Sequence, residues 1–248
     1  MVDWFFQIAE TFDFKMETIE ITMSILDRYV ASNTNLMNDG EKYQLAALTA
    51  LYTAAKVHEE CCLTPYHIQE ISQGKFTCET IMEEEQRILF AVKWLVNPPT
   101  ARTFARILLS LIPSAFLPKK QKRAVLDLVQ KQIDLTLYED IFVPTKPSTV
   151  AVSALFNGLA GVTGDTKLPS FLRHRILKAL DLDKNSWHSI STVRKVLCNL
   201  AFKESSDKEE EQEEESLPEI PTKPQDISGS RPEIRVNSSP RTIVARAC

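Results

Sequence analysis

Residues 43–57 read YQLAALTALYTAAKV, and this stretch decides the fold because small side chains recur through it at helical spacing. These positions are Ala46, Ala47, Ala50, Ala54 and Ala55. Small residues on several faces let neighbouring helices approach closely, so we expect this helix at the centre of a bundle. The same pattern returns 105 residues later, at Ala151, Ala154, Gly158 and Gly161. We therefore predict two helical bundles in tandem; a chance likeness between two alanine-rich core helices is the alternative.

Helical periodicity continues on both sides of this stretch. Residues 16–32 carry one apolar stripe, formed by Ile19, Met23, Leu26 and Val30. Thr64 is a good N-cap for a short helix that begins at Pro65. Further helices are expected near 80–94, 100–112, 119–139, 147–162, 169–180 and 186–202. Because Asn97-Pro98-Pro99 breaks the chain, we predict an all-α protein of two tandem five-helix bundles, over 1–97 and 98–202.

Composition agrees with a helical body that carries a tail. Only 6 of the 248 residues are glycine, which argues against an all-β fold with many tight turns. After Phe202, the last aromatic residue, come an acidic run and a segment with five prolines. Such a segment buries too little apolar surface to fold, so we predict that residues 203–248 are disordered. Within it, Ser206 suits an acid-directed kinase and Ser239 a proline-directed one, which makes both candidate phosphorylation sites.

The net charge of −4 belongs to this tail, since residues 1–202 hold 22 basic and 22 acidic side chains. A neutral body argues against a direct nucleic-acid partner and against binding to an anionic membrane. The five cysteines are odd in number and irregularly spaced, which fits free thiols in a reducing compartment.

No enzymatic motif is present: there is no glycine-rich phosphate loop, His-Glu-x-x-His or nucleophile elbow. The group His58, Cys61, Cys62, His67 and Cys78 matches no usual zinc spacing, so we expect no metal and no cofactor. Glu83, Glu84 and Glu85 point about 100° apart on a helix. We expect this run to form a solvated helix face on which one of the three glutamates is functional. The function is therefore expected to be binding rather than catalysis.

Several stretches, taken in order, resemble the cyclin box of cell-cycle cyclins. They are Met1-Val-Asp-Trp4, Glu17-Thr-Ile19, Leu26-Asp-Arg-Tyr-Val30, Ala54-Ala-Lys-Val-His-Glu-Glu60 and Met82 to Trp94. The second half is a looser match, through Leu137-Tyr138 and Pro147 to Ala154. The resemblance covers nearly all of residues 1–202 and implies two five-helix cyclin folds. It also implies the function of a regulatory subunit that binds and activates a cyclin-dependent Ser/Thr kinase to control cell-cycle progression.

The resemblance also implies two surfaces. In cyclins a lysine at the end of the third helix and a glutamate in the fifth contact the kinase, and here they match Lys56 and Glu85. The apolar part of that interface matches Val57, Leu89, Trp94 and Val96. The alternative is that Lys56 and Glu85 form an internal surface pair worth at most about 1 kcal/mol.

The second implied surface is a groove that docks substrates and inhibitors carrying an Arg/Lys-x-Leu motif. Its matching positions are Met1, Trp4, Gln7, Tyr43 and Gln44. Gln7 replaces a carboxylate that is often present, which weakens the attraction for a basic motif. The alternative is that Trp4 is simply part of the core.

One departure concerns Asp27, whose usual arginine partner in the family lies just before the point where this sequence begins. An unpaired buried charge is costly, so we expect either an incomplete copy of a longer protein or a shortened cyclin, and we favour the first. Pro118 to Arg123, PKKQKR, resembles a simple nuclear-import signal, and we predict a nuclear and cytoplasmic location.

Two other readings stay open. A transcription-type cyclin or a general-transcription-factor relative would use the same tandem fold to bind polymerase machinery or DNA, and would present a basic face. A helical scaffold would bind without activating a kinase. The residues do not separate a G1, S or mitotic cyclin, nor do they identify the kinase.

Overall fold

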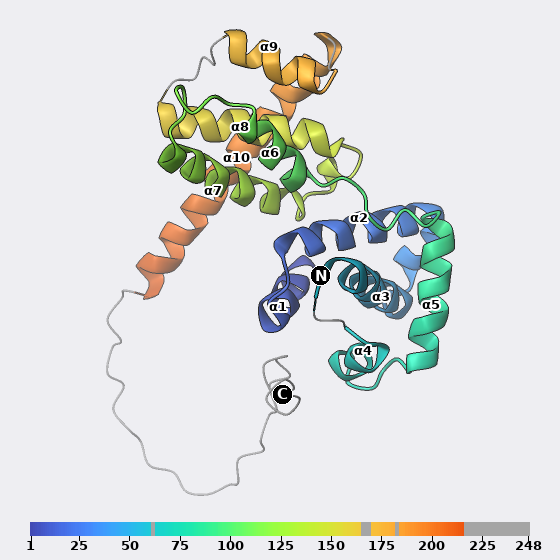
Figure 1. Cartoon of the computed structure of the whole chain (residues 1–248). Coiled ribbons are helices and arrows are strands. Elements are labelled where there is room, and N and C mark those ends of the chain that lie inside the picture. Colours follow the sequence, from blue (N-terminus) through green and yellow to red (C-terminus); the bar gives the residue numbers. More distant parts are fainter. Residues whose placement is uncertain (61–62, 165–169, 182–183, 216–248) are drawn as a thin grey trace, which may run out of the picture.

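The computed structural model describes residues 1–60, 63–164, 170–181 and 184–215, with side chains left undescribed at 184–185 and 205–215. The described residues form two groups of helices, which Figure 1 shows as two lobes. The first group is α1 (Val2–Phe12), α2 (Met16–Ser32), α3 (Gly40–His58), α4 (Pro65–Ile71) and α5 (Cys78–Ala91). The second is α6 (Ala101–Ser110), α7 (Lys119–Thr136), α8 (Pro147–Thr163), α9 (Ser170–Ala179) and α10 (Lys184–Glu215). The prediction of an all-α fold with two tandem bundles is confirmed.

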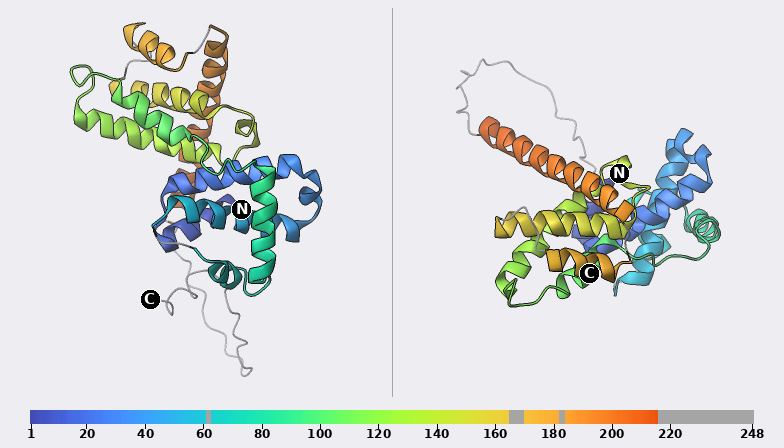
Figure 2. Two further views of the ribbon diagram at one scale, coloured as in Figure 1. Left: turned by 45° about the vertical axis from the view of Figure 1, so that its right-hand side comes forward. Right: turned by 90° about the horizontal axis from the view of Figure 1, so that it is seen from above.

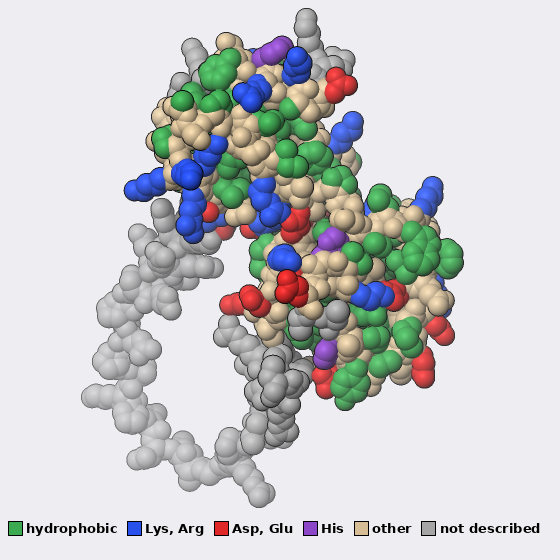
Figure 3. All heavy atoms as spheres, in the orientation of Figure 1, with side chains coloured by type: hydrophobic (Ala, Val, Ile, Leu, Met, Phe, Trp, Pro, Cys, Tyr) green, Lys and Arg blue, Asp and Glu red, His purple; other side chains and the backbone are tan. Residues whose placement is uncertain are grey.

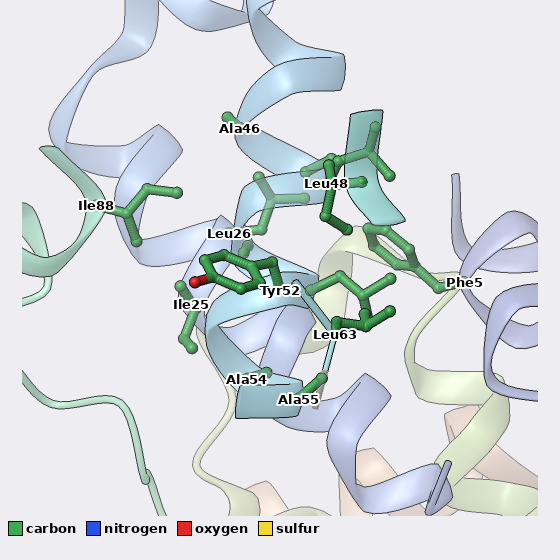
Figure 4. Packing of buried hydrophobic residues seen from close by; sticks show 14 of the residues in the cluster. Phe5, Ile25, Leu26, Ala46, Leu48, Tyr52, Ala54, Ala55, Leu63 and Ile88 are labelled. Atoms are coloured by element: carbon green, nitrogen blue, oxygen red, sulfur yellow. The ribbon is translucent and has the colours of Figure 1, made fainter. Parts of the chain in front are cut away.

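The alanine-rich helix lies at the centre of the first bundle, as its pattern predicts. Every residue of α3 from Leu45 to Ala55 is buried, and α2, α4 and α5 pack around it. Figure 4 shows Phe5 of α1, Leu26 of α2 and Ile88 of α5 gathered around this helix. The short alanine side chains leave room for these larger ones on several sides of α3 at once.

The second bundle repeats this arrangement around α8, which packs against α6, α7 and α10. Its core is a separate cluster of buried hydrophobic residues. Gly158 lies where α8 packs closely on α7, because a Cβ built there would be 3.1 Å from the backbone oxygen of Val125. A Cβ at Gly161, one turn later, would meet only the flexible end of Leu128, at 3.3 Å.

This difference gives a prediction with its own control. Gly158→Ala is expected to lower the free energy of unfolding by about 1–2 kcal/mol, because overpacking against backbone outweighs alanine's higher helix propensity. Gly161→Ala should be neutral or stabilising, since the Leu128 side chain can move. Urea unfolding followed by circular dichroism measures both variants, and equal effects would contradict the close packing of α7 on α8.

Most helix ends follow capping signals in the sequence. Asp39 accepts hydrogen bonds from the N–H groups of Glu41 and Lys42, so α3 begins at Gly40, before the predicted start at 43. Thr64 caps α4 and shares a reciprocal pair of hydrogen bonds with His67.

The predicted end of the fifth helix at Trp94 is wrong. α5 ends at Ala91, and Lys93 and Trp94 take left-handed backbone conformations, with φ of 53° and 60°. The helix end is unmarked in the sequence because glycine or asparagine usually occupies such positions.

The last helix was also expected to be shorter. α10 continues to Glu215, 13 residues beyond the predicted end at 202 and into the segment predicted to be disordered. Glutamate and lysine have high helix propensity, and extending an existing helix needs no new nucleation. Figure 2 shows α10 projecting from the second bundle. No helix in the described part of the chain is both long and apolar enough to cross a bilayer.

The two bundles meet where α2 lies against the start of α6 (Figure 1). Glu17 accepts hydrogen bonds from the hydroxyls of Thr100 and Thr103 and pairs with Arg106. Glu20 accepts the N–H of Ala101 and therefore satisfies a donor at the first turn of α6. These long-range contacts fix the direction in which α6 leaves the first bundle.

Candidate functional site

The structure brings Lys56 and Glu85 together. Lys56 lies in the last turn of α3, and its Nζ donates to Oε1 of Glu85 on α5 at 2.5 Å. The Glu85 side chain is 11% exposed and the Lys56 side chain 43% exposed. The lysine therefore reaches solvent, whereas the carboxylate is set into the surface beneath it.

The surroundings hold this lysine in its charged form. Burial alone lowers the pKa of Lys56, but the hydrogen bond and negative charge of Glu85, with a smaller contribution from Tyr52, outweigh it and raise that pKa. The ammonium group also lies 4.9 Å from the centre of the Tyr52 ring, within reach of a cation–π interaction. Lys56 is thus a fixed positive charge whose position is set by α3 and α5 together.

The three adjacent glutamates differ in role, and the expectation of a solvated face is wrong for two of them. Only Glu83 is exposed. Glu84 is buried, accepting the Tyr29 hydroxyl at 2.9 Å and pairing with Arg87 at 2.9 Å. Glu84 therefore joins α5 to α2, while Glu85 serves the Lys56 pair.

Apolar side chains lie near this pair in the sequence, at the end of α3, along α5 and in the turn after α5. Trp94 is 64% exposed and Val57 48% exposed, while Leu89 and Val96 are partly buried. Sequence reasoning missed three further exposed residues here, namely Met82, Phe90 and Leu95. We call these nine residues, with Lys56 and Glu85 among them, the α3–α5 surface. Figure 3 shows hydrophobic side chains gathered over α5 on the outer side of this bundle.

The turn after α5 shapes this surface. Trp94 packs edge-on against Phe90, with ring centroids 6.2 Å apart. The carbonyl oxygen of Val96 lies 3.4 Å from the His58 ring, which ties the segment after the turn to the end of α3. In the sequence, the helical periodicity does not distinguish Phe90 from buried hydrophobic residues. Only the structure shows that its side chain is exposed.

The five groove residues lie on α1 and at the start of α3. Met1 and Gln7 are exposed, whereas Trp4, Tyr43 and Gln44 are partly buried. Trp4 and Tyr43 both pack against the first core, so each side chain lies partly in the core and partly at the surface. Gln44 accepts a hydrogen bond from Lys75 at 2.9 Å.

Asp27 lies close to Tyr43, and no described lysine or arginine forms an ion pair with it. No described residue donates a hydrogen bond to it. Burial and the nearby charge of Asp140, in the short 3-10 helix Asp140–Phe142, raise the pKa of Asp27 to about 6. Burial first, then Asp27 and Asp140, likewise raise the pKa of Tyr43.

Asp27→Asn is therefore expected to stabilise the protein above neutral pH. With its pKa raised from 3.8 to about 6, the wild-type carboxyl favours folding when protonated, and that stability is lost as pH rises through this window. At pH 8 the variant should gain about 2 kcal/mol, after discounting for partial exposure, and the gain should vanish near pH 4. Urea unfolding at several pH values measures this, with the exposed Asp127→Asn as control. A gain that does not change with pH would contradict the assignment.

Other candidates are not brought together. The described residues contain no group of three or more His, Cys, Asp or Glu side chains that could hold a metal ion. Cys61, Cys62 and Ser239 lie outside the described residues, and Ser206 falls in α10 without a described side chain. The PKKQKR segment begins α7, where Lys122 donates to the carbonyl of Ile112 at 2.5 Å.

Comparisons with known proteins agree with this fold. Residues 1–97 match the family model described as the cyclin N-terminal domain. The G2/mitotic-specific cyclin-2 of Medicago sativa is 29% identical over 165 residues, 66% of this chain and 47% of the relative. The G2/mitotic-specific cyclin-4 of Saccharomyces cerevisiae is 26% identical over 156 residues, 63% of this chain and 32% of the relative. The chain thus spans less than half the length of these relatives.

Solved structures show the same architecture. A viral cyclin from herpesvirus saimiri aligns with a TM-score of 0.58 at 18% identity, covering 81% of this chain and 86% of that one. A chain of the CAK complex of Chaetomium thermophilum, bound to ATP-gamma-S, aligns at 0.57 and 15% identity, covering 80% and 60%. Two tandem five-helix bundles define the fold class that this chain shares with these structures. Residues 1–97 of this chain carry the N-terminal domain of the cyclin family, and the described chain as a whole shares the fold of these cyclin structures.

Proposed function

We propose that this protein is the regulatory subunit of a cyclin-dependent protein kinase, which it binds through the α3–α5 surface and activates. The observation that carries the proposal is the Lys56–Glu85 pair, at 2.5 Å, within a surface where Trp94 is 64% exposed. Exposed aromatic side chains around a fixed charge are typical of interfaces, where the apolar part supplies affinity and the charge sets orientation.

The proposed mechanism is a shift in the kinase's conformational population. A kinase is competent only when its Lys–Glu ion pair has formed and its activation loop is ordered. A rigid helical surface that packs better on that arrangement binds it more tightly and so increases its population. The cyclin would contribute binding energy and no catalytic group, which agrees with a family of regulatory subunits.

The names of the relatives favour the G2/mitotic class over the other cyclin classes. Affinity purification of the tagged chain across a synchronised cell cycle, followed by identification of the kinase and an assay on histone, tests both points. We expect histone kinase activity in the purified fraction, highest near mitosis. A kinase that binds without becoming active would favour the scaffold reading, and the absence of any kinase would overturn the proposal.

We further propose that Met1, Trp4, Gln7, Tyr43 and Gln44 dock Arg/Lys-x-Leu segments of substrates and inhibitors. The negative charges of Asp27 and Asp140 act on Tyr43, so they could attract a basic motif that Gln7 itself does not. Trp4→Ala should abolish binding of a labelled docking peptide without affecting kinase binding. Peptide binding that ignores this change would contradict the groove.

The proposed location is nucleus and cytoplasm. Lys119, Lys120 and Arg123 of the PKKQKR segment are exposed at the start of α7, where an import receptor could reach them. Imaging of a fluorescent fusion should show nuclear protein, and substitution of these three residues by glutamine should reduce it.

A further inference from the structure

The neutral charge of residues 1–202 hides two strongly charged halves. Residues 1–97 hold 7 basic and 15 acidic side chains, a net charge of −8, and residues 98–202 hold 15 basic and 7 acidic, a net charge of +8. Figure 3 shows the same separation, with Lys and Arg gathered over the second bundle and Asp and Glu over the first. The argument from neutrality against a nucleic-acid partner therefore does not hold for the second bundle.

The two bundles also treat their cations differently. In the first, five of the seven form ion pairs, namely Lys15, Lys42, Lys56, Lys75 and Arg87. Among the described residues of the second, only Arg102 and Arg106 do so. Unpaired surface cations repel one another, and an anionic partner relieves that repulsion while releasing counterions.

Six of these unpaired cations lie near the start of α7 and along α9. Phe116, three residues before α7, packs edge-on against Phe171 in the first turn of α9, with ring centroids 5.9 Å apart. This contact brings the loop before α7 close to the first turn of α9. We call six exposed cations, three near the start of α7 and three on α9, the basic end: Lys119, Lys120, Arg123, Arg173, Arg175 and Lys178.

The basic end also presents aromatic surface. Leu172 and Ile176 bury one face of α9, so Phe171, Arg175 and Lys178 share the outer face, where Phe171 is 53% exposed. The guanidinium of Arg173 lies 3.5 Å from the centre of the Trp187 ring, which fixes its position. The positive end of the α7 helix dipole adds to the charge of its lysines.

The chain's own acidic residues are badly placed to occupy this end. Residues 204–215 carry a net charge of −7, but α10 carries them away from it. Trp187, near the start of α10, contacts Arg173, whereas Glu204 acts on Asp134 and Tyr138 at the opposite end of α7. The remaining residues, 216–248, have a net charge of +2 and cannot supply the anion.

We propose that the basic end binds single-stranded nucleic acid, with its cations on the phosphate backbone and Phe171 stacked on a base. Six clustered cations suit a regularly spaced polyanion, and an exposed ring among them suits unpaired bases. The acidic first bundle repels the same strand and so confines it to this end. This proposal is independent of kinase binding.

Fluorescence anisotropy of the full-length protein with labelled oligo-dT, over a range of salt concentrations, tests the proposal. Lys119→Gln/Lys120→Gln/Arg123→Gln should weaken binding roughly 100-fold at low salt and reduce the salt slope by about 2 units. Lys131→Gln/Lys195→Gln/Lys203→Gln is the matched control, because it removes the same charge from exposed positions of the same bundle. Phe171→Ala should weaken binding roughly 10-fold without changing the slope.

Circular dichroism establishes that each variant is folded. A duplex that binds more tightly than oligo-dT would overturn the assignment to single strands. The proposal also fails if oligo-dT does not bind at low salt or if the control triple has the same effect as the first. Binding only to polyglutamate, to anionic vesicles or to a second copy of the chain would overturn it as well.

Discussion

Replacing both Lys56 and Glu85 with alanine is expected to abolish kinase activation and to weaken kinase binding at least about 100-fold. Truncating a desolvated, hydrogen-bonded charge at an interface costs about 2–5 kcal/mol. The result of the single change Lys56→Ala is harder to interpret, because it leaves the Glu85 carboxylate, 11% exposed, without its cation. The double variant removes both charges, so the free protein should stay folded.

A charge swap separates an interface role from an internal one. Lys56→Glu/Glu85→Lys can rebuild the ion pair within this protein but presents the opposite sign to the kinase. We expect a folded and inactive variant. If the pair served only the internal stability of the surface, the swap would retain activation. Lys75→Ala/Glu41→Ala is the matched control, since it removes an exposed pair of the same residue types from elsewhere in the first bundle. Pull-down and histone phosphorylation measure all three variants.

Arg102→Met is expected to lower the free energy of unfolding by about 3–5 kcal/mol at pH 8. The Arg102 side chain is 7% exposed and lies between Asp134, to which it donates a hydrogen bond, and Glu20, at 3.8 Å. Burial raises the pKa of Glu20 to about 7, although the Ala101 N–H and Arg102 both lower it. Methionine keeps the apolar volume but leaves the Glu20 and Asp134 carboxylates without the cation that lies between them.

The loss should shrink as pH falls. Without Arg102 the pKa values of Glu20 and Asp134 rise further, so protonation near pH 5 removes the uncompensated charge in the folded state. Adding Glu20→Gln and Asp134→Asn to Arg102→Met should recover most of the lost stability at pH 8. Urea unfolding tests this at both pH values. Arg106→Met is the control, because that side chain is 51% exposed and its pair contributes at most about 1 kcal/mol. An equal loss from the two methionine variants would contradict a buried junction.

The features that sequence predicts well are those carried by local periodicity. The small residues of α3 and α8 place both helices at the centres of their bundles, and Thr64 marks the start of α4. The Lys56–Glu85 pair is different, since 29 residues separate its members and only the family resemblance joins them. Glu20, Arg102 and Asp134 were missed for the same reason: each is an ordinary charged residue on its own helix, and their meeting depends on how the bundles pack.

Two features depend on the position of residues as well as on composition. The acidic run after Phe202 has the composition of a disordered tail, yet it directly extends a helix that the second core has already nucleated. The summed charge of residues 1–202 concealed an acidic bundle joined to a basic one. In both places the physical property depends on where residues lie, and a total over the chain does not contain that information.

The left-handed turn at Lys93 and Trp94 restricts which sequences can occupy the α3–α5 surface. A tryptophan at φ 60° carries backbone strain of about 1–2 kcal/mol, and a β-branched residue there would be a steric outlier. Valine and isoleucine would satisfy an apolar partner but not this backbone. The residues that occupy position 94 in related sequences should therefore lack β-branching, for a reason unrelated to binding. A comparison of related sequences that scored only hydrophobicity would attribute this restriction to partner binding, although the backbone of the turn imposes it.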